Sequence, residues 1–315
     1  MKKILITGGA GNIGGALARK LVESQKYYVV VADNLSTGNK SKLPSKQHKN
    51  WSFVLCDINN YQDISELMLS YKFDYVFHYA AVVGVQRTLD NPVDVLKDID
   101  GIKNILNLAK NTSVKRAFFS SSSEVYGEPV ELPQNEETTP LNSRLPYAVV
   151  KNVGESFFRS YNQTYDLPFT IFRFFNTYGP NQSNDFVIPH FLKLALLNKN
   201  ITVFGDGHQT RTFCYVDDNV YTCVKILENN LVINDVVNIG SSNEMRIIDL
   251  AEKLIQITNS KSKIIHLPPL PEGDMKRRQP DNSKMLKILA KPLISLEIGI
   301  QKMLDDENFM NYVRN

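Results

Sequence analysis

The sequence predicts an α/β protein in which a doubly wound parallel sheet is followed by a smaller α/β domain. Up to about residue 175, short β-branched runs alternate with helical patterns, which is typical of a parallel sheet covered by helices on both faces. The 315 residues exceed the usual size of one hydrophobic core. After residue 176 the pattern is less regular and is interrupted by proline and glycine, which indicates a second lobe.

Each element of the first part is placed from its residue pattern. We expect strands at residues 3–7, 28–32, 53–56, 75–78, 116–121 and 169–174, and helices at residues 13–24, 63–69, 93–109 and 147–165. In a doubly wound sheet, ligands bind at the carboxyl ends of the strands. We expect the first domain to comprise residues 1–175, rejoined by a segment near 212–240, and the second to comprise most of residues 176–315.

Composition and charge argue against several other classes of protein. Hydrophobic residues make up 43% of the chain and charged residues 22%, as in ordinary globular enzymes. No run approaches the roughly 18 apolar residues of a membrane span, and the start turns too quickly into glycines for a secretory signal. We therefore expect a cytoplasmic protein without a membrane partner. The net charge is only +3, so no nucleic acid is expected, and neither the three cysteines nor the histidines have the spacing of a metal site.

A glycine-rich turn follows the first expected strand. Gly9, Gly11 and Gly14 satisfy the pattern Gly-x-Gly-x-x-Gly, which lets the backbone and a helix N-terminus approach a pyrophosphate. Asp33 ends the next strand about 20 residues later, as a dinucleotide-binding fingerprint requires. Its carboxylate would bind ribose hydroxyls and repel a 2′-phosphate, so the pattern favours NAD over NADP. Asp57, which closes the third strand, either reaches the adenine or caps the next helix.

A serine-rich strand end and a Tyr-x-x-x-Lys pair indicate proton-transfer chemistry. Tyr147 and Lys151 are spaced i, i+4 at the start of an expected helix, so both side chains lie on one face. A nearby ammonium is expected to lower the pKa of the tyrosine and make it a usable base. Residues 120–124 leave hydroxyl groups at the carboxyl end of a strand, where the sheet presents groups to ligands. Surface packing and a serine-rich turn are the alternatives.

Taken together, these motifs resemble the extended short-chain dehydrogenase/reductase family, in its branch of nucleotide-sugar epimerases, dehydratases and decarboxylases. The resemblance covers nearly the whole chain and is carried by residues 7–14, 33–38, 78–81, 121–127, 146–151, 174–180 and 205–211. It implies a Rossmann-type NAD-binding domain, a domain that binds a nucleotide-diphosphate sugar, and a homodimer. The paired helices of that dimer would include residues 93–109 and 147–165.

The resemblance also implies roles for individual residues. Ser122 would be the catalytic serine, Tyr147 the base, and Lys151 the partner of the base that also holds the nicotinamide ribose. Asn176 and Arg211 would bind the substrate diphosphate, with a surface salt bridge as the alternative for Arg211. The implied cofactor-binding residues are Gly8, Gly11, Asn12, Ile13, Gly14, Asp33, Asn34, Asp57, Ile58, Ala80, Ala81, Tyr147 and Lys151.

Members of this branch share a first step, which the resemblance implies for this chain. Tyr147 takes the proton of the sugar 4-hydroxyl while C4 delivers hydride to NAD, which gives a bound 4-keto sugar. An epimerase then returns hydride to the other face, a dehydratase eliminates water, and a decarboxylase loses the carboxylate of a uronic acid. Residues 33–38 and 146–155 resemble the epimerases, so we expect a UDP-hexose 4-epimerase.

Several residues depart from the epimerase pattern. Glu124 resembles the acid of dehydratases and decarboxylases, although Ser123 stands where dehydratases usually have an aspartate. Pro271 replaces an arginine that many sugar epimerases use for the diphosphate. Arg278 resembles the decarboxylase ending, and it either takes over the phosphate contact, faces the C6 end of the sugar or forms a structural ion pair. Asp98 stands where asparagine is common, so this acid would need a partner or a raised pKa.

Other reactions and one non-enzymatic role compete with the epimerase. Within the enzyme class the alternatives are a UDP-uronic acid decarboxylase, an NDP-sugar 4-dehydrogenase and a 4,6-dehydratase. A binding protein of the same family would be expected to lack Ser122, Tyr147 or Lys151, and this chain keeps all three. Glu124 separates the enzymes, because hydride transfer at C4 does not need that acid whereas decarboxylation or dehydration does.

Overall fold

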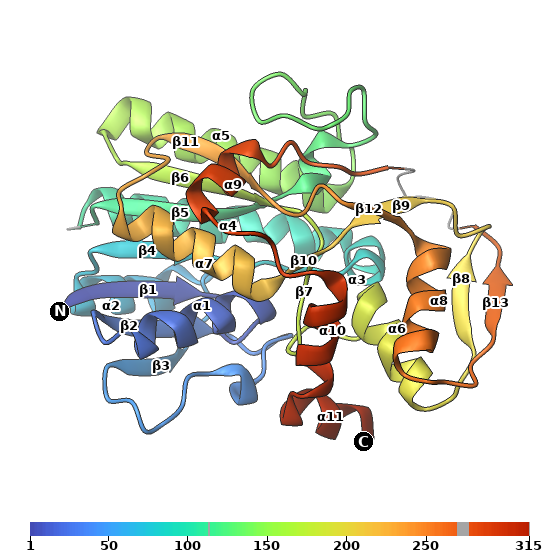
Figure 1. Cartoon of the computed structure of the whole chain (residues 1–315). Coiled ribbons are helices and arrows are strands. Elements are labelled where there is room, and N and C mark those ends of the chain that lie inside the picture. The colour runs from blue at the N-terminus through green and yellow to red at the C-terminus, as the bar shows by residue number, and fades with distance from the viewer. Residues whose placement is uncertain (113, 270–276, 315) are drawn as a thin grey trace.

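The computed structural model describes residues 1–112, 114–269 and 277–314 and has a parallel sheet at its centre (Figure 1). Seven strands form it in the order β11, β6, β5, β4, β1, β2, β3, and all neighbours run parallel. The strands are β1 Lys2–Thr7, β2 Tyr27–Asp33, β3 Trp51–Leu55, β4 Tyr75–His78, β5 Arg116–Ser122, β6 Phe169–Phe174 and β11 Asp235–Ile239. The predicted doubly wound α/β fold is confirmed, and the six predicted strands are all present.

Helices cover both faces of the sheet, and the strand sequences show why. Successive residues of a strand point to opposite faces, so Ile4 and Ile6 belong to one core cluster and Leu5 to the other. α1 and α7 pack on the first face, whereas α2, α4 and α5 pack on the second. These helices are α1 Asn12–Glu23, α2 Tyr61–Tyr71, α4 Pro92–Lys110, α5 Pro146–Tyr165 and α7 Val216–Glu228. Both faces are therefore apolar, as a buried parallel sheet requires.

Smaller elements lie beyond the carboxyl ends of the strands, on the right of Figure 1. Three short strand pairs occur there: β8 with β13 and β7 with β10, both parallel, and β9 with β12, antiparallel. Their bounds are β7 Thr177–Tyr178, β8 Ile201–Phe204, β9 Thr210–Thr212, β10 Cys214–Tyr215, β12 Glu244–Arg246 and β13 Ile264–Leu267. The remaining α-helices are α3 Val85–Asp90, α6 Val187–Leu196, α8 Ile247–Ile257, α9 Ser283–Leu289, α10 Leu296–Leu304 and α11 Glu307–Arg314. Of these, α9 packs against α7 and β11 of the main sheet.

Two elements of the later sequence return to the sheet. α7 packs against α1, and β11 pairs with β6 as the seventh strand. Both belong to residues 216–239, close to the segment expected to rejoin the first domain. The division of the chain into two domains at residue 175 stays a prediction. None of the helices within the described residues is long and apolar enough to cross a membrane.

The strand order places a ligand site between β1 and β4. β2 and β3 lie on one side of β1, and β4, β5, β6 and β11 lie on the other. Ligands of such sheets bind outside the carboxyl ends of the strands at this reversal. Gly8 leaves β1 at this point, and a Cβ on Gly8 would lie 2.6 Å from the Cα of Ala80, just beyond β4. The two loops therefore meet at the floor of the site.

Candidate active site

A cavity of about 330 Å³ lies outside the carboxyl ends of β1, β2, β4 and β5. It is bounded by the glycine turn, the start of α5 and the loop that precedes α6. The predicted cofactor residues in its lining are Gly8, Gly11, Asn12, Ile13, Gly14, Asp33, Asn34, Asp57, Ile58, Ala80, Ala81 and Tyr147. The lining also contains the predicted catalytic and substrate residues Ser122, Glu124, Asn176 and Arg278. The fold thus brings most of the predicted site together around one cavity.

The turn after β1 is shaped to hold a phosphate group against the backbone. Gly8 has a φ of +66°, and a Cβ on Gly14 would lie 2.4 Å from the carbonyl oxygen of Gly8. α1 begins at Asn12 with no side-chain cap on its first turn, so its first amide groups can face an anion. The Asn12 Oδ1 atom is buried and has no hydrogen-bond partner within the described residues. These features fit the pyrophosphate of a dinucleotide.

Asp33 is fixed at the end of β2 by the glycine turn itself. Its Oδ2 accepts a hydrogen bond of 2.9 Å from the amide of Ala10, and its Oδ1 accepts one of 2.8 Å from Leu35. Each carboxylate oxygen keeps a lone pair that can accept from a ribose hydroxyl. The cap alternative for Asp57 is wrong, because α2 is capped by Asn60, whose side chain accepts from the amide of Gln62. Asp57 instead lines the cavity.

The predicted serine, tyrosine and lysine converge at the junction of β5 and α5. The hydroxyls of Ser122 and Tyr147 form a hydrogen bond. Ser122 Oγ also accepts from the amide of Glu124 at 3.2 Å, which fixes its direction. One turn along α5, Lys151 is only 2% exposed, and its Nζ lies 5.6 Å from the centre of the Tyr147 ring. Tyr147 thus reaches the cavity with Lys151 beneath it.

The titration of Tyr147 corrects one expectation from the sequence. Burial raises the pKa of Tyr147 well above its ordinary value, and the negative charge of Glu124 raises it further. The hydrogen bond with Ser122 and the charge of Arg278 act in the opposite direction, but they do not outweigh burial. The expected net lowering of this pKa is therefore wrong for the protein alone, because desolvation of the phenolate dominates.

Asp98 has both a hydrogen-bond partner and a raised pKa, the two features that burial of this acid was expected to require. Its side chain accepts a hydrogen bond of 2.7 Å from the amide of Val82 and another from the side chain of Asn59. Burial raises the pKa of Asp98, while these bonds and the charge of Lys151 lower it. Burial lowers the pKa of Lys151 to about 8, although the negative charge of Asp98 acts to raise it. Each side chain thus favours the charged form of the other.

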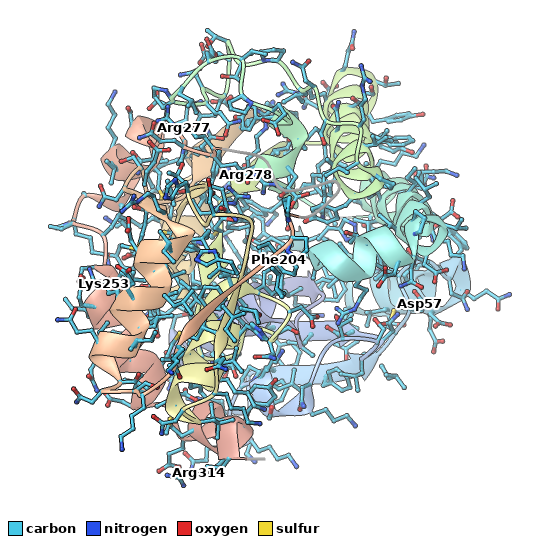
Figure 2. All side chains as sticks on the ribbon, turned by 90° about the vertical axis from the view of Figure 1, so that its right-hand side faces the viewer. Asp57, Phe204, Lys253, Arg277, Arg278 and Arg314 are labelled. Carbon is cyan, nitrogen blue, oxygen red and sulfur yellow. The ribbon has the colours of Figure 1, made fainter. Side chains whose placement is uncertain are left out.

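Glu124 and Arg278 form an ion pair in the lining of the cavity. Arg278 Nη1 lies 3.3 Å from Glu124 Oε1, and the two side chains are 6% and 18% exposed. Both charges act on the nearby phenol of Tyr147. Arg277 differs, since it is half exposed and pairs with Glu244 at 2.6 Å; Arg278 lies closer to the centre of the molecule (Figure 2). The predicted ion pair of Arg278 is thus present, and it is made inside the cavity.

The segment that carries Arg278 is anchored to the loop after β5. The amide of Gln134 donates to the carbonyl of Gln279 at 2.7 Å, and the amide of Asp281 donates to the carbonyl of Gln134 at 2.8 Å. Asn135 Nδ2 adds a bond of 3.0 Å to Asp281. These bonds hold residues 279–281 alongside residue 134, which places Arg278 over Glu124 although the two are far apart in sequence.

The predicted substrate residues lie in different places. Asn176 lines the cavity with a φ of +29°, and its Nδ2 is buried with no partner within the described residues. Arg211 lies on β9, outside the cavity lining, and its Nη1 donates to the carbonyl of Thr210 at 2.8 Å. Its diphosphate role stays a prediction. Pro271, the departure from the epimerase pattern, lies outside the described residues.

Sequence reasoning missed part of the cavity wall. Arg87 of α3 lines the cavity and pairs with Asp185 at 2.6 Å. Gln182, Ser183 and Phe186 add the wall before α6. These residues form no periodic pattern, and only the preceding motif at residues 174–180 could have drawn attention to them.

Comparison with known proteins agrees with this geometry. The family described as "NAD dependent epimerase/dehydratase family" matches residues 4–240. UDP-N-acetyl-alpha-D-glucosaminuronate decarboxylase of Bacillus cytotoxicus is 35% identical, with 96% of this chain and 97% of the relative covered. The structure of UDP-glucose 4-epimerase from Thermotoga maritima with UDP-glucose has a TM-score of 0.91 at 30% identity, and covers 99% of this chain and 100% of that one.

A second solved structure contains a uronic acid derivative. It is a variant of UDP-glucuronic acid 4-epimerase from Bacillus cereus, in complex with UDP-4-deoxy-4-fluoro-glucuronic acid and NAD. Its TM-score is 0.88 at 31% identity, with 98% of this chain and 99% of that one covered. The glycine turn and Asp33 fit NAD, which is the cofactor of the family. The chain therefore belongs to the NAD-dependent epimerase/dehydratase family, within the extended short-chain dehydrogenases/reductases.

Proposed function

We propose that this enzyme decarboxylates a UDP-uronic acid after oxidising it at C4. The observation that carries this proposal is the ion pair of Glu124 and Arg278 in the cavity, beside the phenol of Tyr147. A guanidinium is suited to a carboxylate, and a nearby acid can exchange a proton with carbon C5 of the sugar. UDP-glucuronic acid decarboxylase 3 of Arabidopsis thaliana, which is 35% identical with 99% of this chain covered, supports the same reaction.

The first step belongs to the residues at the junction of β5 and α5. Tyr147 takes the proton of the 4-hydroxyl, and the Ser122 hydroxyl aligns the same oxygen through its bond to the phenol. Lys151 lies beneath them and supplies positive charge to the developing phenolate. When bound, NAD supplies the hydride acceptor at C4 and the hydride donor that restores C4 at the end. The glycine turn and Asp33 would hold it.

The second step uses the 4-keto acid that this oxidation leaves. The bond between C5 and C6 breaks, carbon dioxide departs, and the electron pair moves onto the C4 oxygen as an enolate. The hydroxyls of Tyr147 and Ser122 donate hydrogen bonds to that oxygen. Arg278 holds the carboxylate beforehand. Glu124, protonated from solvent once the substrate carboxylate has taken its place on Arg278, delivers that proton to C5 and is left as a carboxylate.

The test is the product formed from a panel of nucleotide sugars. Purified protein is incubated with UDP-, GDP-, CDP- and dTDP-sugars, uronic acids included, and products are followed by NMR and mass spectrometry. We expect loss of carbon dioxide from a UDP-uronic acid. Glu124→Gln and Arg278→Gln should lower this rate about 100-fold or more while C4 oxidation persists, because only the second step uses the proton donor Glu124 and the carboxylate-binding Arg278. Arg277→Gln, an exposed neighbour, is the control and should retain full activity.

The 4-epimerase favoured by the sequence is the second candidate. Residues 146–155 resemble epimerases, and the structural neighbours from Thermotoga maritima and Bacillus cereus are epimerases at 30% and 31% identity. An epimerase has no use for a proton at C5, so Glu124→Gln would keep most of its activity. A product of unchanged mass with inverted C4 would overturn the decarboxylase and establish this candidate.

We also propose that the enzyme works as a homodimer, with Asn176 and Arg211 on the substrate diphosphate. Apolar side chains support the dimer: Val93 and Leu96 of α4, with Val149 and Tyr165 of α5, are exposed by 36% to 68%. α4 and α5 pack side by side, so a second copy could pair with both and form a four-helix bundle. The unpartnered Asn176 Nδ2 supports its role toward the substrate.

A further inference from the structure

Asn238 is a buried polar residue on β11 that the chemistry proposed above does not use. It is fully buried and lies outside the lining of the cavity. Both polar atoms of its side chain have partners: Nδ2 donates to the carbonyl oxygens of Gln134 at 2.9 Å and of Asp281 at 3.3 Å, and Oδ1 accepts from the hydroxyl of Tyr126 at 2.8 Å. Asn238 therefore joins the edge strand of the sheet to the loop after β5 and to the segment that follows Arg278.

The direction of the Asn238 amide is set by the chemistry of its partners. Arg173 Nη1 donates to the Tyr126 hydroxyl at 2.8 Å, and a guanidinium can only donate. The single proton of that hydroxyl therefore goes to Asn238 Oδ1, which leaves Nδ2 facing the two carbonyl oxygens. An amide turned the other way would place Oδ1 against two acceptors. The amide thus has one stable orientation.

Arg173 connects this amide to the strand that carries the proposed catalytic serine. Its guanidinium is held by Glu155, which also accepts a hydrogen bond of 2.6 Å from Ser121. Ser121 directly precedes Ser122 on β5. A continuous line of buried hydrogen bonds therefore runs from behind Ser122 through Arg173 to the Asn238 amide.

The other end of this line controls the segment that follows Arg278. The amide of Gln134 donates to the carbonyl of Gln279 at 2.7 Å, and the amide of Asp281 donates to the carbonyl of Gln134 at 2.8 Å. The Gln134 carbonyl thus accepts from both the Asp281 amide and Asn238 Nδ2. Asn238 also binds the Asp281 carbonyl, so a single side chain fixes both partners of this contact.

We propose that Asn238 is a positioning residue for the second step, which holds the segment after Arg278 so that the guanidinium faces Glu124 and the sugar carboxylate. The importance of Arg278 for the reaction rests on the proposed function, whereas the anchoring by Asn238 does not. A displacement of about 1 Å in a reacting or binding group can cost roughly 100-fold in rate. Loss of Asn238 should therefore slow the step that uses Arg278 and leave the step at Tyr147 intact, because Tyr147 is held by α5.

The direct test is hydrogen exchange of backbone amides, which requires no turnover. Peptides that contain the amides of Gln134 and Asp281 are followed by mass spectrometry in the wild-type protein and in Asn238→Ala. We expect both amides to exchange about tenfold faster or more, because loss of the Nδ2 bonds loosens residue 134 from residues 279–281. Thr170→Val is the matched control, since Thr170 is also fully buried and its hydroxyl donates to the carbonyl of Val232 at 2.7 Å, beside the start of β11. It should leave exchange of both amides unchanged.

Single-turnover kinetics on UDP-glucuronic acid then separate positioning from stability. Formation of NADH reports oxidation at C4, and release of carbon dioxide reports the second step. In Asn238→Ala we expect carbon dioxide release to slow about 10- to 100-fold while NADH forms at the wild-type rate and accumulates. In the background of Arg278→Gln, Asn238→Ala should have no further effect on carbon dioxide release, because it acts through Arg278.

Unchanged exchange of both amides overturns the proposal. An equal loss in both steps also overturns it and leaves Asn238 a structural residue. If Asn238→Ala does not fold, Tyr126→Phe removes the bond that orients the same amide and should give the same step-specific loss, of smaller size. If the wild-type protein releases no carbon dioxide from any UDP-uronic acid, the proposed function fails, and amide exchange still decides whether Asn238 anchors the segment.

Discussion

Glu155→Gln is expected to destabilise the protein strongly, because it removes one partner of a buried ion pair. Glu155 of α5 meets Arg173 of β6 through two bonds, 2.9 Å from Nε to Oε1 and 2.7 Å from Nη2 to Oε2. Ser121 Oγ donates to the same Oε1 at 2.6 Å, beside the catalytic end of β5. The side chains of Arg173 and Glu155 are 3% and 2% exposed. The pair therefore joins α5, β5 and β6 directly behind Ser122.

The magnitude follows from what the substitution leaves behind. Burial acts to lower the pKa of Arg173, but the bond and charge of Glu155 outweigh it and raise this pKa above its ordinary value. Arg173 thus stays charged in Glu155→Gln, with its charge partner removed. A buried charge without its partner costs roughly 3–5 kcal/mol. Glutamine keeps the shape and an acceptor for Ser121, so the measured loss reports the charge.

The assay is urea unfolding of matched variants, followed by circular dichroism. Glu244→Gln is the control, because Glu244 pairs with Arg277 near the surface and should cost about 1 kcal/mol or less. The double variant Glu155→Leu with Arg173→Met should recover much of the loss, since it leaves no unpaired charge. Equal losses in Glu155→Gln and Glu244→Gln would refute the reasoning.

Other predictions address the cofactor, the base and the dimer. Gly14→Ala should weaken NAD binding about tenfold or more, a loss of about 1.4 kcal/mol, because its Cβ would lie 2.4 Å from the Gly8 carbonyl oxygen; calorimetry measures this. Asp33→Ser should narrow the preference for NAD over NADP in the same assay. Tyr147→Phe should retain NAD but lower kcat by about 10²- to 10⁴-fold, and unchanged turnover would remove Tyr147 as the base. Leu96→Asp should shift the sedimentation coefficient toward that of a monomer.

The sheet and its helices could be predicted because their signals repeat. The strands alternate faces with a period of two, and both faces are covered, so each strand is a continuous apolar run. Pro92 and Pro146 stand at the first positions of α4 and α5, where proline is tolerated, and they fix the helix starts. β11 was missing from the predicted strands, since five residues at the sheet edge carry little pattern of their own.

The candidate site was predictable where its residues are close in sequence. Tyr147 and Lys151 were placed together by their i, i+4 spacing, and the serines were placed beside them by the order of strand and helix. The family resemblance then singled out Ser122. Arg278 was different, because three roles were open from the sequence, and the long-range backbone bonds of Gln134 that place it beside Glu124 follow no sequence pattern. The pKa of Tyr147 also depended on burial, which a spacing rule does not contain.

The first step that we propose uses residues that are close in sequence, whereas the second uses residues that are far apart in sequence. This difference explains how members of one family can share the oxidation at C4 and differ in the reaction that follows. Ser122, Tyr147 and Lys151 are built into the sheet and α5, so the oxidation at C4 that we propose for them is tied to the fold. Arg278 instead belongs to a segment that is held against residue 134 by a few backbone bonds. A change in that segment can replace the group facing Glu124 without disturbing the sheet. The outcome of the reaction is therefore expected to follow residue 278 more closely than overall identity.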